Sequence, residues 1–387
     1  MPYYKPLKNV SATVRKRTVD NLKDLREQLD AQLPKKNTAE SLIVGTWNIR
    51  NFDDNRFNHG PRLEESFYYL AEIMSRFDVL AVQEVCRDLR PLQKLMGILG
   101  WKYDFILTDV THKSVGGNDE RLGFIFDKNK VDFRGVAGEL VLPPEMIISE
   151  TADTRRQFSR TPFSCLFQSG WFKFMFATVH IYFGSSSTGT PEYERRVQEI
   201  SRVAEYLADE AEKSDNNYIL VGDFNILRPS SRGFNAIEDN GFQVIQNRHG
   251  SNADQTKFYD QISFKARENE LQIVDPERDD RVFQFFDAVF TEAKFLKYRS
   301  TIRRMVERKM DDVDYQLANT TSASRCQKLT RKKESLQELI ATDEATLVYY
   351  LKKWRTFQMS DHLPLWLELK VDFSSEYLDY LRAYTPE

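Results

Sequence analysis

Short apolar runs separated by polar turns dominate the chain from residue 41 onward. Val, Ile, Leu and Phe recur in short blocks or at intervals of two, which is the pattern of strands buried in a sheet. Apolar residues at helical spacing predict helices over residues 63–77 and 192–211. Many strands with few interposed helices indicate two sheets packed face to face with helices outside. The predicted strands cover residues 41–47, 79–82, 121–126, 163–167, 172–182, 218–221, 261–264, 282–290 and 363–371.

Two segments depart from this pattern and read as helical additions. Residues 11–34 carry leucines at a spacing of three to four and end at Pro34, which predicts an amphipathic helix. We expect this helix to pack on the domain, or to contact a protein partner or a second copy of the chain. Residues 293–356 predict two helices, over 292–316 and 324–354, joined by a turn at 319–324.

The predicted hairpin has an unusual charge. Residues 293–356 hold 15 Lys and Arg against 8 Asp and Glu, a net charge of +7, whereas the whole chain carries −3 and the remainder therefore −10. Such a local excess on an acidic background is typical of a surface that binds nucleic acid or a protein partner. A solvated hairpin that braces the core is the alternative.

The composition is that of a soluble globular protein. Of 387 residues, 41% are apolar and 29% charged. No stretch approaches the roughly 18 consecutive apolar residues of a membrane span, so we expect a cytoplasmic protein with no membrane span. The three cysteines lack metal-ligand spacing, and we expect no disulfide to support the fold.

Polar residues follow several of the predicted strands, where functional side chains are often found. Two of only five histidines, His180 and His362, lie in apolar strand contexts. Asp223 and Asn225 end another strand, and side chains two residues apart share a face if the chain stays extended. The same sequence also suits an Asx turn.

Further strand ends carry amides and carboxylates. Asn48 follows the first predicted strand, although an amide there is often only a turn residue. Glu84 follows an apolar run that we expect to be buried on both faces, where a carboxylate is costly unless it is paired or binds a cation. His362 follows Asp361 directly and needs an acceptor to fix its tautomer if it acts as a base, and Asp260 is a candidate for that acceptor.

Taken in order, these motifs resemble the endonuclease/exonuclease/phosphatase superfamily, and within it the deoxyribonuclease I-like branch. The resemblance covers residues 41–292 and 353–373. It implies an α+β fold, a four-layer α/β/β/α sandwich of two mainly antiparallel sheets, with the helical hairpin inserted. The matching segments begin at Trp47 (Trp-Asn-Ile-Arg), Gln83 (Gln-Glu-Val), Glu120 (Glu-Arg-Leu-Gly), Val179 (Val-His), Gly222 (Gly-Asp-Phe-Asn), Tyr259 (Tyr-Asp-Gln-Ile) and Ser360 (Ser-Asp-His-Leu-Pro).

The predicted domain organisation follows from this coverage. Residues 1–40 form an N-terminal helical extension, and residues 41–373 form the endonuclease/exonuclease/phosphatase domain. The basic helical insertion at 293–356 interrupts that domain, and residues 374–387 are a C-terminal tail.

The resemblance implies roles for the matched residues. Glu84 would bind a divalent metal ion, with Asn48 beside it and Asp361 completing the metal site. Asp223 and Asn225 would position the phosphate and the attacking water.

Two carboxylate–histidine pairs are implied as well. Glu120 would orient His180, Asp260 would orient His362, and Arg160 would contact the phosphate. Hydrolysis of a phosphodiester needs an activated water, neutralised phosphate oxygens and a protonated leaving group. An oxygen-rich site suits Mg²⁺, with Mn²⁺ as the alternative ion. We expect His362 to be the general base and His180 the general acid, although the near symmetry of the pairs leaves the order open.

These features predict an intracellular, Mg²⁺-dependent DNA endonuclease, with a 5′-phosphate and a 3′-hydroxyl as the implied products. A phosphodiesterase or phosphatase that acts on a phospholipid or a small molecule is the alternative, and a non-catalytic scaffold is a third interpretation. Cys86 stands where the family often has arginine, which puts a DNA contact by Arg87 in doubt.

Overall fold

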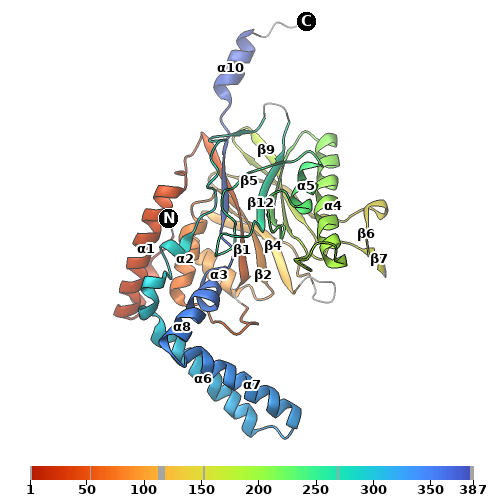
Figure 1. Cartoon of the computed structure of the whole chain (residues 1–387). Helices are drawn as coiled ribbons and strands as arrows, with labels where there is room; N and C mark the ends of the chain where they lie inside the picture. Colours follow the sequence, from red (N-terminus) through yellow and green to blue (C-terminus); the bar gives the residue numbers. More distant parts are fainter. Residues whose placement is uncertain (1, 53, 112–117, 151–152, 268–269, 384–387) are drawn as a thin grey trace.

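Two six-stranded sheets form the centre of the protein (Figure 1). The computed structural model describes residues 2–52, 54–111, 118–150, 153–267 and 270–383. In each sheet two neighbouring strands run parallel, β1 with β2 and β9 with β10, and the other pairings are antiparallel. The first sheet has the order β13 (Gln272–Ile273), β14 (Leu365–Lys370), β1 (Ser41–Phe52), β2 (Val79–Cys86), β4 (Glu120–Asp127) and β3 (Tyr103–Leu107). The second has the order β11 (Gln243–Val244), β12 (Asp260–Lys265), β10 (Asn217–Asp223), β9 (Phe172–His180), β8 (Phe163–Ser169) and β5 (Asp132–Glu139).

Helices cover the outer faces of both sheets. Against the first sheet lie α1 (Ala12–Gln32), α2 (Glu64–Met74) and α3 (Arg90–Leu99). Against the second lie α4 (Pro191–Lys213) and α5 (Arg232–Glu238), with a separate ribbon of β6 (Ile148–Glu150) and β7 (Asp153–Arg156). The predicted α/β/β/α sandwich is therefore confirmed.

Alternation along the strands sets these layers. On β1, Leu42 and Val44 belong to the core between the sheets, whereas Ile43 and Trp47 belong to the core under the helices. Successive side chains of a strand point to opposite faces, so a strand covered on both sides reads as one continuous apolar run. The outer core also takes in α1, whose Leu25 and Leu29 are fully buried.

A long helical arm extends from the sandwich (Figure 1). After a 3₁₀ helix (Glu292–Lys297), α6 (Arg299–Ala318) and α7 (Ala323–Ile340) form the predicted hairpin. The second predicted helix, 324–354, was too long. It ends at Ile340, and α8 (Asp343–Tyr349) begins after Thr342, whose hydroxyl accepts a hydrogen bond from the Ala345 N–H. A π-helix (Tyr350–Trp354) and α9 (Arg355–Gln358) complete the return to the domain.

The predicted strand over residues 282–290 is wrong. Val282 makes only an isolated bridge to Leu365, and a 3₁₀ helix spans Phe285–Asp287. The apolar run was real, because Phe283 and Phe290 are fully buried in the outer core, but periodicity alone cannot distinguish a buried strand from another buried segment.

Several elements were not predicted, among them α3, β3, β5 and α5. Within the tail, α10 (Ser374–Ala383) is a short helix without a buried side chain. None of the described helices combines the length and the apolar character that crossing a membrane requires.

Candidate active site

Most of the predicted site residues continue the inter-sheet face of their strands. On β9, Phe174, Phe176 and His180 lie an even number of residues apart, and on β10 Asp223 follows Val221 in the same way. Side chains at even spacing in a strand share a face. The polar side chains therefore begin where the apolar core between the sheets ends.

Three other strands repeat this arrangement. Glu120 on β4 and Asp260 on β12 each stand two residues before a core residue, Leu122 and Ile262, and both residues are 2% exposed. Asn48 on β1 is fully buried and in phase with the inward-facing positions of that strand. Strands distant in sequence thus deliver their polar ends to one place.

Glu84 reaches the same place by breaking the alternation. Val79 and Ala81 face the other sheet, so regular pleating would turn residue 84 away from it. The pairing of β2 shifts register between Val82 and Val85, and Glu84 has a φ of 63°. A bulge turns the side chains that follow it to the other face of the strand, so the bulge directs the Glu84 carboxylate toward the site. Positive φ values in residues other than glycine are strained and cluster at functional sites.

Asn48 holds two carboxylates together. Its amide nitrogen donates to Oε1 of Glu84 at 2.9 Å and to Oδ2 of Asp223 at 3.0 Å. Its Oδ1 accepts from the Arg50 N–H, and Oε2 of Glu84 accepts from the Asn51 N–H. Asn48 therefore faces the carboxylates with its donor group, while its oxygen is engaged by the backbone.

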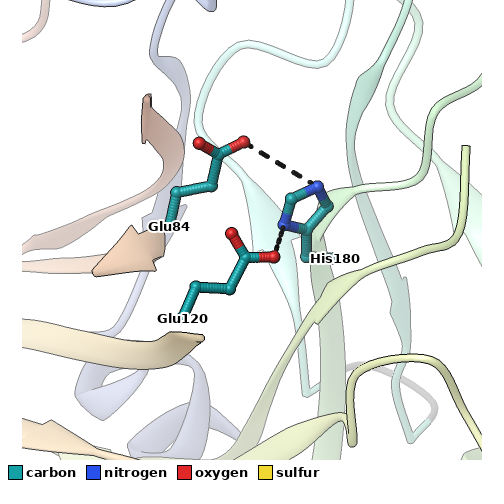
Figure 2. Close-up of side chains that lie close together, drawn as sticks. All are labelled: Glu84, Glu120 and His180. Carbon is teal, nitrogen blue, oxygen red and sulfur yellow. Dashed lines mark ion pairs between the residues drawn. The ribbon is translucent and has the colours of Figure 1, made fainter. Parts of the chain in front are cut away.

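The first carboxylate–histidine pair joins the two sheets (Figure 2). Nδ1 of His180 lies 3.1 Å from Oε1 of Glu120, and Nε2 lies 4.0 Å from Oε1 of Glu84. The guanidinium of Arg160 pairs with Glu120 and donates to the His180 carbonyl. Burial raises the pKa of Glu120, but His180 and Arg160 outweigh burial and lower it to about 2.

In the second pair the two sheets exchange roles, because the histidine precedes a strand of the first sheet and the carboxylate lies on the second. Nδ1 of His362, in the loop before β14, lies 2.8 Å from Oδ2 of Asp260 on β12. The Ser251 hydroxyl donates to the same Oδ2 at 2.7 Å. Burial raises the pKa of Asp260 despite the opposing effect of His362, and its Oδ1 is a buried oxygen with no hydrogen-bond partner among the described residues.

Asp223 lies between the two histidines. Its Oδ2 is 3.5 Å from Nε2 of His180 and 3.7 Å from Nε2 of His362. Burial lowers the pKa of both histidines, and Arg160 also lowers that of His180, but the surrounding carboxylates outweigh these effects and raise both pKa values above the ordinary range. The two imidazoles thus share one central carboxylate, and the carboxylates around them make both rings more basic.

The other predicted residues lie at the border of this cluster. Asn225 does not continue the strand, since its φ is 53° and its N–H donates to Oδ1 of Asp223, which is the Asx turn. Its side-chain amide donates to the Ile181 carbonyl. Asp361 is about half exposed and lies 3.5 Å from Nε of Arg50, so a cation of the chain faces this carboxylate.

The donor set suits a divalent cation. Two groups have ligand atoms within 4.8 Å of one another, namely Glu84 with Glu120 and His180, and Asp223 with Asp260 and His362. In the first group, Arg160 pairs with Glu120 and not with Glu84. The neutral amide of Asn48 holds Glu84 beside Asp223. Two carboxylates so placed repel each other, and an oxygen-binding cation relieves that repulsion. Among the described residues, Asp361 belongs to neither of these two groups.

Two contacts around the second pair were not foreseen from the sequence. The Ser251 hydroxyl also accepts from the Asp260 N–H, and the Ser251 carbonyl accepts from the N–H of Leu363, the residue after His362, so this serine ties Asp260 to the loop that carries His362. The Tyr259 ring lies against the His362 ring, with 5.4 Å between centroids. Ser251 stands in a polar loop, where nothing in the sequence distinguishes it from an ordinary turn residue. Tyr259 directly precedes Asp260 and opens the matched Tyr-Asp-Gln-Ile segment, which was its signal in the sequence.

The model of the endonuclease/exonuclease/phosphatase family matches residues 45–362, and the chain belongs to this family. The family is one of metal-dependent phosphoesterases that include nucleases and phosphatases. No curated protein matches the chain.

Several solved structures are similar in fold. A family member from Bacteroides thetaiotaomicron shares 16% identity and a TM-score of 0.48, covering 86% of this chain and 99% of that one. The human Nocturnin catalytic domain shares 18% identity over 60% of this chain and 84% of its own, with a TM-score of 0.45. A mannosyl-6-phosphatase from Bacteroides thetaiotaomicron shares 18% identity, with a TM-score of 0.43, over 60% of this chain and 87% of its own.

Proposed function

We propose that this protein is a Mg²⁺-dependent endonuclease that hydrolyses DNA phosphodiester bonds. The observation that carries the proposal is the convergence of two carboxylate–histidine pairs on Asp223, directly beside Glu84. One group that gives a proton and one that takes a proton, on two sides of an anion site, are what phosphodiester hydrolysis requires.

The metal ion would be held by Glu84, with Asn48 and Asp223 beside it. When bound, it would neutralise charge on the phosphate oxygens. Arg160, which is 8% exposed, keeps Glu120 ionised, and Glu120 in turn holds Nδ1 of His180, so that Nε2 of this histidine is directed toward the leaving oxygen.

His362 is the general base in this proposal. Among the described residues, the Asp260 carboxylate contacts Nδ1 of His362 and accepts one further side-chain hydrogen bond, from the Ser251 hydroxyl. The Glu120 carboxylate, in contrast, is shared between His180 and the cation of Arg160. An undivided carboxylate makes the imidazole more basic, which suits removal of a proton from water. His180, with the weaker partner, gives its proton to the leaving group.

The charge of the helical hairpin favours a long polyanionic substrate in this proposal. Among the described residues, no carboxylate lies within 4.0 Å of the exposed Arg304, Arg308, Arg331 or Lys332. The hairpin base also contacts the segment that carries Asn48, since Arg50 donates to Thr356. Cations without a carboxylate partner, on an arm that is joined to the domain at this point, are suited to phosphate contacts along DNA.

Cleavage of supercoiled plasmid in Mg²⁺, Mn²⁺ or EDTA tests the proposed reaction. We expect metal-dependent nicking that is lost in His362→Ala and in Asp223→Ala. Arg202→Ala, which removes an arginine of α4 that pairs with Glu205, should behave as the native protein and serves as the control variant. Hydrolysis of a phospholipid or a small phosphoester without nicking would replace the nuclease by a phosphatase of the same family.

Charge reversal on the hairpin tests the substrate. Arg304→Glu, Arg308→Glu and Lys332→Glu together should weaken DNA binding and flatten its dependence on salt, by up to about 0.9 in the logarithmic slope for each phosphate that the variant no longer neutralises. Reversal of Arg202 and Lys213 on α4 is the matched control. An unchanged slope would leave the hairpin as a brace or a protein-binding surface.

A further inference from the structure

A cavity of about 690 Å³ opens directly beside Asn225. The loop that follows β10 forms one wall, the first turn of α5 another, and α4 with the loop before it forms the third. Its lining includes three arginines, Arg196, Arg228 and Arg232, together with hydroxyl groups such as those of Ser187 and Ser231. A volume of several hundred Å³ is that of a site for a nucleotide-sized ligand.

Arg196 is the unusual member of this lining. It is only 3% exposed, yet no carboxylate of the described residues lies within 4.0 Å of it. Its Nη1 donates to the Phe183 carbonyl at 2.9 Å, and its guanidinium lies 5.0 Å from the centroid of the Tyr193 ring and 5.4 Å from that of Phe183. Burial lowers its pKa, against the opposing effect of Asp223 among others.

A buried guanidinium without a carboxylate is costly to the folded protein. The cost is offset when an anion enters and accepts the hydrogen bonds that the guanidinium has left. Arg228 is exposed and likewise has no carboxylate within 4.0 Å in the described part of the chain, whereas Arg232 is neutralised by both oxygens of Glu194. Two cations of the cavity are therefore available to a ligand.

We infer that this cavity binds a second phosphate of the substrate, adjacent to the phosphate that is cleaved at Asp223. The inference rests on the proposed phosphoester hydrolysis, because it gives the cavity a place beside that reaction. Planar guanidinium groups and hydroxyls suit phosphate oxygens, and the aromatic rings around Arg196 fix its direction. The second phosphate belongs either to the next linkage of a nucleic acid chain or to a small bisphosphate.

Two pairs of substrates separate these sources. The first pair is an oligothymidylate whose linkages are uncharged methylphosphonates, with either one phosphodiester or two adjacent ones. The second pair is thymidine 5′-monophosphate and thymidine 3′,5′-bisphosphate. For each pair, kcat/KM with Mg²⁺ gives a preference for the second phosphate.

We expect the native protein to prefer the two-phosphate member of one pair by roughly 10- to 100-fold, as one or two charge-assisted hydrogen bonds provide. Arg228→Ala and Arg196→Met should each reduce that preference by about 10-fold or more. Arg228 is exposed, so its variant is expected to fold even if Arg196→Met does not. Arg202→Ala, an arginine of the same helix α4 that pairs with Glu205, should keep the preference.

Equal rates on both members of each pair, or a preference that survives both variants, would overturn the cavity inference and leave the proposed function intact. A native protein that cleaves none of the four substrates would count against the proposed function. Fluorescence anisotropy in EDTA then decides the cavity separately. Tighter binding of the two-phosphate oligomer that disappears in Arg228→Ala keeps the inference, and equal binding of both oligomers overturns it.

Discussion

His180 with Glu120 and His362 with Asp260 are built alike, and their surroundings differ. In both pairs a carboxylate at a strand end lies about 3 Å from Nδ1, at 3.1 and 2.8 Å. Arg160 pairs with Glu120, so the first pair contains a permanent buried cation. The pKa of Glu120 therefore falls to about 2, in spite of the burial that acts against it.

Among the described residues, no lysine or arginine lies within 4.0 Å of Asp260. A serine hydroxyl is its additional partner, one of its oxygens is unpartnered within the described structure, and burial raises its pKa. Similar distances therefore do not imply equal chemistry. In the first pair the Arg160 cation keeps the Glu120 carboxylate ionised. In the second pair the protonation state of Asp260 depends on that of His362, and the reverse holds as well.

The largest expected effect concerns the two histidines. His180→Asn and His362→Asn should each lower kcat on DNA by about 10²- to 10⁴-fold, as removal of a general acid or base does. A p-nitrophenyl phosphodiester has a leaving group that departs without a proton. On that substrate His362→Asn should keep its full loss of activity and His180→Asn should lose little, measured as kcat at saturating Mg²⁺. The opposite order would exchange the roles of acid and base.

A smaller effect concerns stability and its dependence on pH. The pKa of Glu120 is about 2 in the folded protein against 4.5 ordinarily, so its ionised form stabilises the fold above pH 4.5, by about 3 kcal/mol, and this contribution is lost as pH falls toward 2. Glu120→Gln should therefore differ most from the native protein at pH 7, and the difference should narrow in acid. Urea unfolding in EDTA from pH 7 to pH 3 measures it.

Asp260→Asn provides the contrast in the same experiment. Because burial raises the pKa of Asp260, its ionised form opposes folding, and the native protein gains stability relative to this variant as pH falls through the raised pKa. If both variants showed the same dependence on pH, the proposed difference between the pairs would not hold.

The smallest effect tests the serine of the second pair. Ser251→Ala removes a buried hydrogen bond to Asp260 and should cost about 1 kcal/mol of unfolding free energy. It should also lower kcat, because Asp260 is then less firmly oriented toward His362. Ser263→Ala is the matched control, since this buried hydroxyl on β12 donates to the Leu220 carbonyl and touches neither pair. Equal effects of both variants on kcat would make the role of Ser251 purely structural.

The sequence by itself determined the layered sandwich and most of the side chains that gather at the candidate site. Period-two alternation along β9 and β10 predicts which side chains face the other sheet, and His180 and Asp223 are in phase with the core residues before them. The ordered motifs identified the family, which the match over residues 45–362 confirms. Strand alternation and the order of the motifs can both be read along the chain, without knowing which distant segments meet in the fold.

Only the tertiary structure decided what depends on contacts between distant segments. The bulge that re-aims Glu84, the sharing of Glu120 between Arg160 and His180, and the cavity around Arg196 involve residues from separate strands and loops. The apolar run 282–290 shows the same limit, because the sequence predicted its burial correctly but not its conformation. Alternation fixes the face to which a side chain points, whereas the partner it meets there, and so its charge and pKa, is set by how the two sheets and their loops pack.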